Sequence, residues 1–498
     1  MSAGEIWVGV DLGTQSVRAV ALDESGELLA AARCPLDSWR DSGRHEQDPK
    51  QWWDAAAQVL RGMTGELGAA RARIRAVATC GTSGTFTVLD AHGTVASAGV
   101  MYDDSRAVGR EDGPVDRASV WLREQLGYRV QPTWALPKLA ALVADGALPT
   151  VARVIHQPDV IAASLTGGPV ATDTSSALKS GVDPRAVRWP DAVLAAVGEA
   201  VSLPDVVLPG TVLGAVSEYA AERTGLPRGT AVVAGATDGC AAQLASGALD
   251  VGDWNCVLGT TLVCKGVSRE LVPDRGGATY SHRSPDGTWL PGGASSTGLG
   301  VLSALFGGAD LDALSRTGLR GMPPVCYPLA GTGERFPFLA PGARGFALSG
   351  GHRLPITAAT RDSLGDSAML GALLTGVAYT ERLCFEVLAA TGYPVGGRIR
   401  FAGGATRNPL LTALRARMLG RTVEVPANPE PAAGMAILAA WGCAPGADTL
   451  AARVSRMVRV ESVTEPGGTP GLPLAADLDE GYRRFRSELH ASGWLVPP

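Results

Sequence analysis

Length, composition and charge narrow the range of functions. The chain has 498 residues, which is enough for two large domains or roughly three of ordinary size, and its 46% hydrophobic content supports sizeable cores. A net charge of -5 argues against binding to nucleic acid or to a membrane surface as the main activity.

Apolar segments with strand or helix spacing alternate along the whole chain, which predicts an α/β fold. The strands expected, in chain order, lie at residues 6–10, 17–22, 28–32, 74–80, 86–89, 95–100, 254–258 and 399–402, with a further apolar run that stops at Gly235. The helices expected lie at residues 47–60, 121–143 (broken at Pro132 and Pro137), 156–165, 239–249, 362–391, 410–419, 434–440 and 478–490.

A glycine turn closes the first strand and reads Asp11-Leu12-Gly13-Thr14-Gln15-Ser16. A second strand and a hairpin follow it directly. Such a bend leaves backbone N–H groups free near Thr14, Gln15 and Ser16, where they can contact phosphate oxygens.

The chain is organised around residues 232–261, which read strand, glycine turn, acid, helix, strand and glycine turn. Asp238 stands directly before a helix of small residues, so we expect it to cap that helix and to expose its carboxylate at the mouth of a cleft. About twenty residues later, Gly259-Thr260-Thr261 ends an apolar strand in a tight turn that can hold phosphate.

A weak internal repeat relates the two halves of the chain. Leu12-Gly13-Thr14-Gln15 and Leu258-Gly259-Thr260-Thr261 occupy equivalent places in a strand, turn and hairpin layout. We therefore expect two similar domains, residues 1–249 and 250–498, that face one cleft.

The glycine turns predict a chemistry when they are taken together. Turns at Asp11–Ser16, Gly259–Thr261 and Gly403–Asn408, with one acid, are what phosphoryl transfer from a nucleotide requires, because that reaction depends on positioning and charge neutralisation. No GxxxxGK[ST] and no GxGxxG after a strand is present, which argues against a P-loop enzyme and a dinucleotide site.

Cysteine usage and the opening segment bear on the compartment. The eight cysteines form no CxxC pair and several stand in apolar segments, so we expect buried free thiols rather than a metal or disulfide framework. The opening segment has no charged start with a cleavable apolar core, and no apolar run reaches about 18 residues. These features predict a soluble cytoplasmic protein.

Four segments carry a resemblance to a known family. VGVDLGTQSVRAV, AGATDGCAA, VLGTT and FAGGATRNPLL, in that order, resemble the FGGY carbohydrate kinases over roughly residues 6–443. The resemblance implies two actin-like (RNase H-like) ATPase domains with a cleft between them. It also implies sugar bound mainly by the first domain and ATP mainly by the second.

The resemblance also implies a role for each matching residue. Asp238 is expected to be the general base that deprotonates a sugar hydroxyl, and Asp11 to lie near Mg²⁺, through water. The ATP-binding residues that it implies are Thr14, Gln15 and Ser16 in a first phosphate loop, Gly259, Thr260 and Thr261 in a second, and Gly403, Gly404, Ala405 and Asn408 around the adenosine.

The sugar is less strongly indicated. Gly81-Thr82-Ser83-Gly84 stands where xylulose kinases of the family carry Gln-Met-His-Gly and glycerol kinases carry Gln-Arg-Glu. Thr82 and Ser83, with Asp104 and Asp238, are therefore expected to bind substrate in a manner more similar to the D-ribulose kinases. Asp104 has an equal alternative as a helix cap. Lys179 is interpreted as a solvated loop lysine and His156 as a structural histidine.

The sequence favours an ATP- and Mg²⁺-dependent kinase acting on the terminal hydroxyl of a ketopentose, D-ribulose first and D-xylulose second, with another polyol or sugar as a further alternative. Two hypotheses from other classes remain open. One is a non-catalytic sugar or nucleotide sensor on the same fold, and the other is an actin-like or heat-shock-like ATPase that moves a protein partner. The sequence also leaves a homodimer open.

Overall fold

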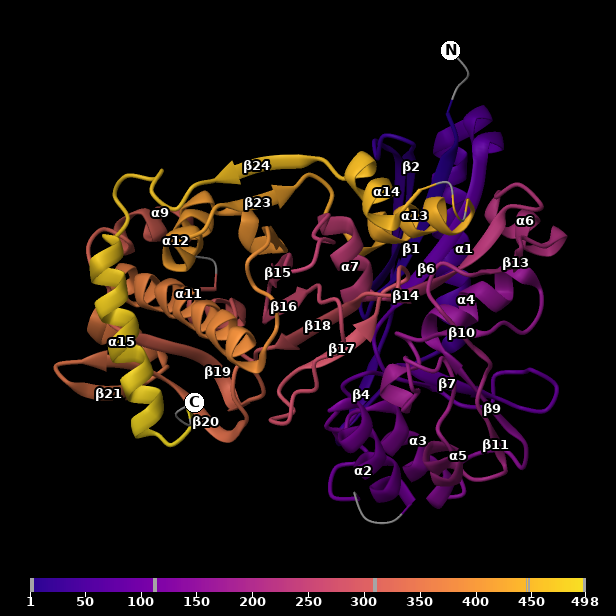
Figure 1. The fold of residues 1–498 in the computed structure, drawn as a ribbon, viewed down its shortest axis with the longest axis horizontal. Coiled ribbons are helices and arrows are strands. Elements are labelled where there is room, and N and C mark those ends of the chain that lie inside the picture. Colours follow the sequence, from indigo (N-terminus) through magenta and orange to yellow (C-terminus); the bar gives the residue numbers. More distant parts are fainter. Residues whose placement is uncertain (1–3, 111–113, 308–310, 445, 447, 496–498) are drawn as a thin grey trace. The chain divides into compact units, whose positions relative to one another are not determined.

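The structure is a computed structural model that describes residues 4–110, 114–307, 311–444, 446 and 448–495 (Figure 1). The chain divides into two compact units. Unit 1 contains Met1–Gly247, Ser281–Leu290 and Asn428–Arg459, and unit 2 contains Ala248–Tyr280, Pro291–Ala427 and Val460–Pro498.

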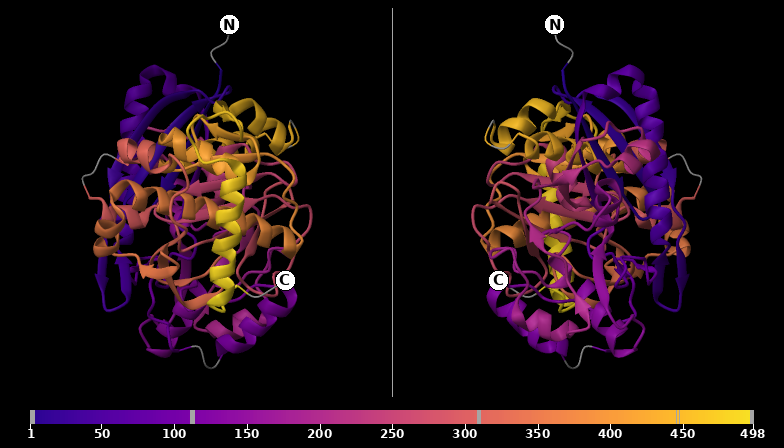
Figure 2. Two further views of the ribbon diagram at one scale, coloured as in Figure 1. Left: turned by 90° about the vertical axis from the view of Figure 1, so that its left-hand side faces the viewer. Right: turned by 90° about the vertical axis from the view of Figure 1, so that its right-hand side faces the viewer.

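The first division lies two residues from the boundary that the sequence predicted at 249/250. Two later segments differ, because Ser281–Leu290 and Asn428–Arg459 belong to unit 1 although the prediction placed them in the second domain. Figures 1 and 2 show the gold helices α13 (Pro431–Gly442) and α14 (Leu450–Met457) beside the indigo strands of unit 1. An apolar helix pattern predicts burial but not which sheet will cover the helix, so the sequence could not reveal this return.

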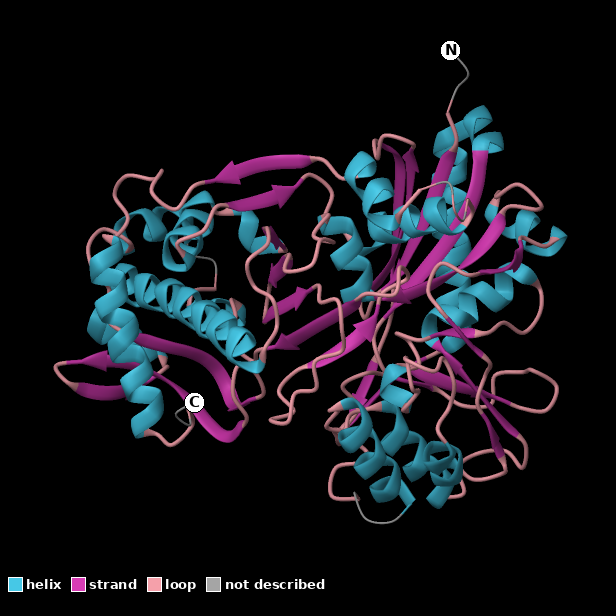
Figure 3. Cartoon of the chain, in the orientation of Figure 1, coloured by secondary structure: helices cyan, strands magenta, loops and turns pink. Residues whose placement is uncertain are grey.

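Unit 1 is built on a six-stranded sheet in the order β13-β14-β6-β1-β2-β3. Strands β1, β6 and β14 are parallel neighbours, whereas the other adjacent pairs are antiparallel. The central strands are buried because helices cover both faces of the sheet (Figure 3). The bounds are β1 (Ile6–Leu12), β2 (Ser16–Asp23), β3 (Leu28–Pro35), β6 (Ile74–Gly81), β13 (Val212–Ala215) and β14 (Ala231–Thr237).

Period-two alternation gives the two faces of β1 different partners. Ile6, Val8, Val10 and Leu12 join the core with residues of α1 (Pro49–Leu67) and α4 (Gln157–Thr166). The opposite face carries Gly9, where a Cβ atom would lie 1.8 Å from the carbonyl oxygen of Ala432 in α13. Asp11 shares the face of Gly9, so its side chain points to the side of the sheet on which α13 packs.

A second glycine contact places α13 against α7 (Asp238–Ser246). A Cβ atom at Gly434 would lie 1.9 Å from the carbonyl oxygen of Ala241. Only glycine permits this approach of helix backbones. The two contacts fix the helix that begins at Asp238 relative to the strand that carries Asp11.

The remaining elements of unit 1 form a second sheet with the order β11-β9-β7-β8-β5-β4, a two-stranded pair β10-β12, and helices. The strand bounds are β4 (Trp39–Asp41), β5 (Arg44–Gln47), β7 (Phe86–Leu89), β8 (Gly99–Val100), β9 (Ala152–His156), β10 (Thr172–Asp173), β11 (Val201–Ser202) and β12 (Val206–Val207). The helix bounds are η1 (Gly68–Arg73), α2 (Pro114–Leu126), α3 (Ala135–Ala144), η2 (Leu178–Ser180), α5 (Asp191–Val197) and α6 (Glu218–Thr224).

Unit 2 repeats the sheet topology of unit 1. The second large sheet has seven strands in the order β17-β18-β16-β15-β22-β23-β24, and β17, most of which belongs to unit 1, has no counterpart in the first sheet. From β18 to β24 the topology is the same, with β15, β22 and β23 parallel and the other adjacent pairs antiparallel. The predicted duplication is therefore confirmed, with β15 in the place of β1. The bounds are β15 (Trp254–Leu258), β16 (Leu262–Gly266), β17 (Tyr280–Arg283), β18 (Trp289–Ala294), β22 (Ile399–Ala402), β23 (Val423–Pro426) and β24 (Val460–Thr464).

A three-stranded sheet and further helices complete unit 2. Their bounds are α8 (Gly300–Leu305), α9 (Leu311–Gly318), β19 (Cys326–Glu334), β20 (Ala340–Ser349), β21 (His352–Pro355), α10 (Ala358–Leu364), α11 (Asp366–Thr391), η3 (Gly404–Arg407), α12 (Pro409–Leu419) and α15 (Ala475–Ala491). Among the described residues, no helix is long and apolar enough to cross a membrane.

Several predicted boundaries are wrong for local reasons. The helix expected at 362–391 is divided at Gly365, whose φ of +86° ends α10 before α11 begins. Strand β1 continues to Leu12, so Asp11 lies inside a strand rather than in the turn after it. Strand β14 continues past Gly235 through a bulge. Glycine is required there, since a Cβ atom would lie 1.8 Å from the carbonyl oxygen of Thr79 on β6. The hairpin strand expected at 95–100 shortens to β8.

A buried ion pair joins α11 to α12 in unit 2. Arg415 donates from Nε and Nη2 to the carboxylate of Glu381, both at 2.7 Å, and both side chains are 0% exposed. The guanidinium also stacks on Phe401 of β22 at 3.5 Å. The two hydrogen bonds therefore join the two helices, and the ring contact ties Arg415 to the strand that leads into Gly403.

We predict that Glu381→Gln lowers the free energy of unfolding of unit 2 by about 3–5 kcal/mol, because it leaves a buried guanidinium without its counter-charge. Replacing both partners (Glu381→Leu with Arg415→Met) should cost less than the single change. Denaturant unfolding followed by far-UV circular dichroism measures the effect. A single variant as stable as the parent would contradict this account.

Candidate functional site

The carboxyl ends of three neighbouring parallel strands bring the predicted acids together in unit 1. In the register of the sheet, Asp11 of β1 is paired with Cys80 of β6, and Thr237 of β14 is paired with Gly81. Asp238 follows Thr237 directly and opens α7. Ligands of open α/β sheets bind at such carboxyl edges, so this edge is the candidate site.

Asp11 is partly exposed at this edge, and its surroundings destabilise the ionised form of its carboxyl group. Burial, followed by the neighbouring charge of Asp238, raises the pKa of the Asp11 carboxyl to about 7. Glu430 acts in the same direction, whereas the thiol of Cys80, which donates to Oδ1 at 3.4 Å, and the cation of Arg18 act against it. A cation beside this carboxylate would relieve the repulsion.

The carboxylates of Asp11 and Asp238 are suitable for Mg²⁺ but too few to hold the ion alone. Carboxylate oxygens are suitable ligands, and Asp11 and Asp238 lie within electrostatic reach of each other. Among the described residues, however, no group of three or more His, Cys, Asp or Glu side chains could hold a metal ion. An ion held here would therefore keep most of its waters or take ligands from a phosphate, as the sequence-based expectation for Asp11 has it.

Asp238 is the first residue of α7 rather than its cap. Thr237 occupies the N-cap position, so the predicted capping role of Asp238 is wrong by one residue. Its Oδ1 accepts a hydrogen bond from the backbone N–H of Gly239 at 2.7 Å, and the side chain is partly exposed. The N-terminal end of a helix favours the ionised carboxylate, which is the form that can accept a proton.

The turn after β1 is closed and braced by its own backbone. The N–H of Gly13 donates to the carbonyl of Ser16 at 3.1 Å, and Gln47 Nε2 donates to the carbonyl of Thr14 at 2.7 Å. The hydroxyl of Ser16 accepts from Arg33 Nε at 3.0 Å, while Gln15 is exposed. These bonds brace the turn and leave Gln15 exposed and Thr14 partly exposed.

The residues predicted to bind sugar differ in what their hydroxyls already contact. Both the N–H and the hydroxyl of Thr82 donate to Gln157 Oε1, at 2.8 and 2.9 Å. The hydroxyl of Ser83 is buried without a hydrogen-bond partner among the described residues. The hydroxyl of Thr82 is thus already bonded within the protein and that of Ser83 is not, and a sugar contact of either residue stays a prediction.

Asp104 is fully buried, with 0% exposure, and its carboxylate is bonded inside unit 1. It accepts from the N–H of His45 at 2.8 Å and from Arg106 Nε and Nη2, both at 2.8 Å. Burial raises the pKa of Asp104, but these bonds outweigh it and the net shift is downward. Residues 101–110 contain turns but no helix, so the helix-cap alternative is wrong. A sugar contact of Asp104 stays a prediction.

Tyr102 was not among the predicted site residues, although Asp104, two residues later, was. Its side chain is 38% exposed, and its hydroxyl bonds with the side chain of Thr14. Burial, then the charges of Asp103 and Asp238, raise its pKa. An aromatic residue directly before two acids and after a strand end was the signal that could have found it.

Lys179 and His156 differ in how far the structure supports their sequence-based interpretations. Lys179 Nζ donates to the carbonyl of Ser83 at 3.0 Å, so it is anchored and not simply solvated. His156 is 1% exposed and bonds through its ring nitrogens with Thr172 Oγ1 at 2.9 Å and Ser180 Oγ at 2.8 Å, as a structural histidine would.

In unit 2, the turn at Gly259–Thr261 is held by the loop before α8. The N–H groups of Leu299 and Gly300 donate to the carbonyls of Gly259 and Thr260, at 2.9 and 3.1 Å. A Cβ atom at Gly298 would lie 2.4 Å from the carbonyl oxygen of Thr260. Glu334 in turn holds this loop through Ser295 Oγ, Ser296 N and Thr297 Oγ1.

The predicted adenosine segment begins where β22 ends. Gly403 has a φ of +86°, and a Cβ atom there would lie 2.6 Å from the carbonyl oxygen of Leu258, so the turns after β15 and β22 are adjacent. Gly404 opens η3 and Ala405 is buried. Both polar atoms of the Asn408 side chain are hydrogen-bonded within the protein. Oδ1 caps α12 by accepting from Leu411 N (3.0 Å), and Nδ2 donates to Ser315 Oγ (3.3 Å).

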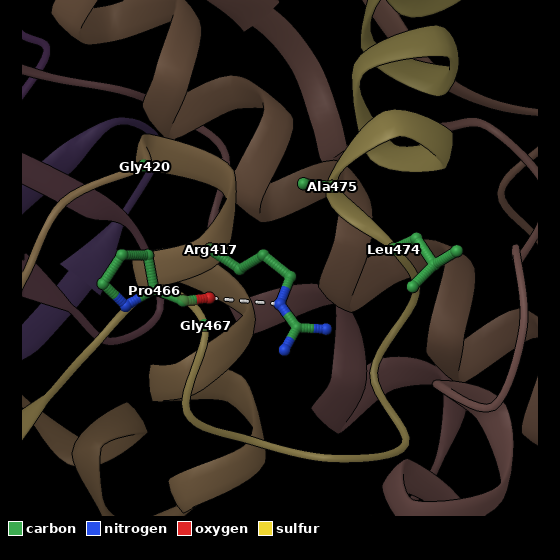
Figure 4. A pocket seen from close by; sticks show the side chains of 6 residues that line it. All are labelled: Arg417, Gly420, Pro466, Gly467, Leu474 and Ala475. Carbon is green, nitrogen blue, oxygen red and sulfur yellow. Dashed lines mark hydrogen bonds between the residues drawn. The ribbon is translucent and has the colours of Figure 1, made fainter.

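Unit 2 also holds a pocket of about 380 Å³ away from these turns (Figure 4). It lies between the end of α12 and the start of α15, where Arg417 Nε donates to the carbonyl of Pro466 at 3.2 Å. Arg417 also donates to the carbonyls of Thr469, Leu472 and Pro473. These bonds fold the loop onto the helix, and none of the predicted site residues lines the pocket.

Comparison with known proteins identifies the family. The model of the FGGY family of carbohydrate kinases, N-terminal domain, matches residues 6–245, and that of the C-terminal domain matches residues 254–443. The chain belongs to the FGGY family of carbohydrate kinases. It is a sugar kinase, and the ATP dependence of the family gives the glycine turns of both units their context. This result favours the kinase over the sensor and the protein-moving ATPase.

Named relatives agree with this assignment. The chain is 30% identical over 467 residues to a xylulose kinase of Streptomyces coelicolor and 28% identical over 462 residues to one of Streptomyces rubiginosus, with 91% of each chain covered in both cases. The crystal structure of xylulose kinase from Rhodospirillum rubrum superposes with a TM-score of 0.81 at 26% identity, covering 98% of this chain and 99% of that one. The α/β fold with two actin-like ATPase domains is thereby confirmed.

We predict that Asp11→Asn raises the free energy of unfolding by about 1–2 kcal/mol at pH 8 without Mg²⁺, because it removes a charge that the folded state disfavours. The cost is absent below the ordinary pKa of 3.8, grows as pH rises and is complete above about 7, so the gain should be smaller at pH 5. Thermal unfolding at both pH values measures it.

Asp23→Asn, on the neighbouring strand β2, is the control. Although its partial burial acts in the opposite direction, hydrogen bonds from Ser25 and Glu27 lower the pKa of Asp23, so its removal should reduce stability at pH 8. Equal effects of the two substitutions would contradict the electrostatic account of Asp11.

Proposed function

We propose that this chain is an ATP- and Mg²⁺-dependent kinase that phosphorylates the terminal hydroxyl of a ketopentose. The observation that carries the proposal is the meeting of Asp11 and Asp238 at one sheet edge, beside the Thr82–Ser83 turn and Tyr102. One carboxylate is then available as a base while the other attracts a cation.

In the proposed reaction, the carboxylate of Asp238 accepts the proton of the terminal sugar hydroxyl. That oxygen forms a bond to the γ-phosphorus of ATP while the bond from this phosphorus to the β–γ bridging oxygen breaks, and ADP leaves. Mg²⁺ would neutralise phosphate charge beside Asp11. Backbone N–H groups and hydroxyls at Thr14–Ser16 and at Gly259–Thr261 would hold the phosphates, and Gly403–Ala405 with Asn408 would receive the adenosine.

Two sugars are candidates. D-Ribulose is supported by the turn Gly81-Thr82-Ser83-Gly84, which lacks the Gln-Met-His-Gly pattern expected of xylulose kinases. D-Xylulose is at least as well supported, because several of the similar proteins are named xylulose kinases. A glycerol kinase of Gloeobacter violaceus is also 28% identical over 448 residues, so a polyol stays a third hypothesis.

Location and assembly are hypotheses of the same proposal. A cytoplasmic enzyme fits eight cysteines that are all free, six of them buried. A homodimer is left open, and sedimentation velocity of the purified protein would decide it. Neither nucleic acid nor membrane enters the proposed activity.

We predict that Asp238→Asn lowers kcat/KM for the sugar on the order of 10³-fold, because an amide cannot accept the hydroxyl proton. ATP affinity, measured by calorimetry, should change less than about twofold, since the base is not required for nucleotide binding. Asp191→Asn is the matched control, because Asp191 is likewise the first residue of a helix, α5, in unit 1. Near-normal turnover by Asp238→Asn would sink the base assignment.

We predict that a coupled ADP-release assay over D-ribulose, D-xylulose, their L-isomers, glycerol, ribitol and gluconate gives the highest kcat/KM with a D-ketopentose. The small residues of the turn at 81–84 and the hydroxyl of Ser83 suit a polyhydroxylated chain that brings its own hydrogen bonds. A clear preference for glycerol or gluconate would refute the proposed substrate class while leaving the kinase assignment intact.

A further inference from the structure

A buried lysine of α3 contacts two segments of the candidate sugar surface, and the proposed reaction does not use it. Lys138 is 0% exposed and is surrounded on its own helix by the buried Leu136 and Leu139. Its Nζ donates to the carbonyl of Gly84 at 3.0 Å and to the carbonyl of Met101 at 2.6 Å. Gly84 ends the turn with Thr82 and Ser83, and Met101 precedes Tyr102.

The two acceptor segments come from different places in the chain. The strands that flank them meet where Phe86 of β7 pairs with Val100 of β8, and Lys138 adds a side-chain donor that contacts the backbone of both segments. The turn at 82–85 is closed by the N–H of Thr85 donating to the carbonyl of Thr82 at 3.3 Å. The second segment is closed by the N–H of Asp104 donating to the carbonyl of Met101 at 3.1 Å, the same carbonyl that Lys138 contacts. One ammonium group therefore spans both segments.

Lys138 is surrounded by a second lysine, an aromatic ring, two acids and an arginine. Lys179 of η2 holds the neighbouring carbonyl, that of Ser83, at 3.0 Å, and Phe86 of β7 presents its ring 6.0 Å from the Lys138 ammonium. Asp103, Asp104 and Arg106 lie on the segment after Met101. Burial, then the positive charge of Lys179, lowers the pKa of Lys138 to about 7, with Arg106 acting in the same direction and the two acids against it.

We propose that Lys138 is a positioning residue for sugar binding, whose ammonium group fixes the Thr82–Gly84 turn relative to the segment of Tyr102. This inference rests on the proposed function, because it assigns the two segments to the sugar. Lys138 acts through the backbone and touches no reacting atom. Loss of its proton weakens both hydrogen bonds, since bonds from an ion are roughly twice as strong as bonds from a neutral donor.

The experiment uses the full chain with Lys138→Met, Lys138→Gln and, as a matched control on the same helix, Leu139→Met. Methionine keeps the length and removes both donors, whereas glutamine keeps a neutral donor and guards against a failure of the methionine variant to fold. Hydrogen exchange is followed without ligands at the amides of Thr85 and Asp104. KM for the sugar, KM for ATP and kcat are followed from pH 6 to pH 8.5 at saturating Mg²⁺.

We expect Lys138→Met to speed exchange at both amides at least about tenfold and to raise KM for the sugar about tenfold, with KM for ATP changed less than about twofold. In the parent protein KM for the sugar should rise several-fold between pH 6 and pH 8.5. Lys138→Gln should bind sugar better than Lys138→Met, and its KM for the sugar should rise less between pH 6 and pH 8.5 than that of the parent. Asp11 is common to all variants, so differences between them report Lys138. Leu139→Met should match the parent.

Two results would overturn the inference. Unchanged exchange at Thr85 and Asp104 in both lysine variants would show that Lys138 does not fix the segments. Faster exchange with an unchanged KM and pH profile would show a merely structural lysine. If the parent phosphorylates no sugar, the proposed function fails, and the exchange measurement still decides whether Lys138 joins the two segments.

Discussion

The site depends on one constraint, which is that β1, β6 and β14 are parallel neighbours and end at the same edge of a sheet. Two carboxylates far apart in the chain, Asp11 and Asp238, are thereby placed on either side of Cys80. Their mutual repulsion, added to burial, raises the pKa of Asp11 to about 7. A fold optimised only for stability would avoid such a pair, so the repulsion marks this sheet edge as a candidate functional site.

The same sheet topology serves two purposes in the two units. The register of the repeat places Val257 of β15 where β1 carries Asp11, so the strand end of unit 2 offers no carboxylate. It offers instead the turns at Gly259 and Gly403. A Cβ atom at Gly403 would lie 2.6 Å from the carbonyl oxygen of Leu258, whereas one at Gly259 would meet no atom within 4 Å. One copy of the fold thus carries the two predicted acids, and the other carries a glycine turn with no carboxylate at the position equivalent to Asp11.

Many polar side chains of the site are bonded inward and leave only a few for a ligand. Thr82 is held by Gln157, Asp104 by Arg106, and Asn408 by the start of α12. These bonds satisfy groups that burial would otherwise penalise, and they fix the turns that carry the outward groups. Lys138 extends the same principle, because one buried ammonium braces two turns at once.

The sequence by itself determined the elements and the chemistry: the strands at 254–258 and 399–402, the turns at Gly13, Gly259 and Gly403, the duplicated layout and the two acids follow from local pattern and motif. Tertiary structure decided the rest. Residues 428–459 return to unit 1 because Gly9 and Gly434 admit α13 against β1 and α7, a complementarity that no local pattern shows. The internal bonding of Asp104, the position of Tyr102 and the bridge made by Lys138 depend on long-range packing, which sets burial and hydrogen-bond partners independently of residue type.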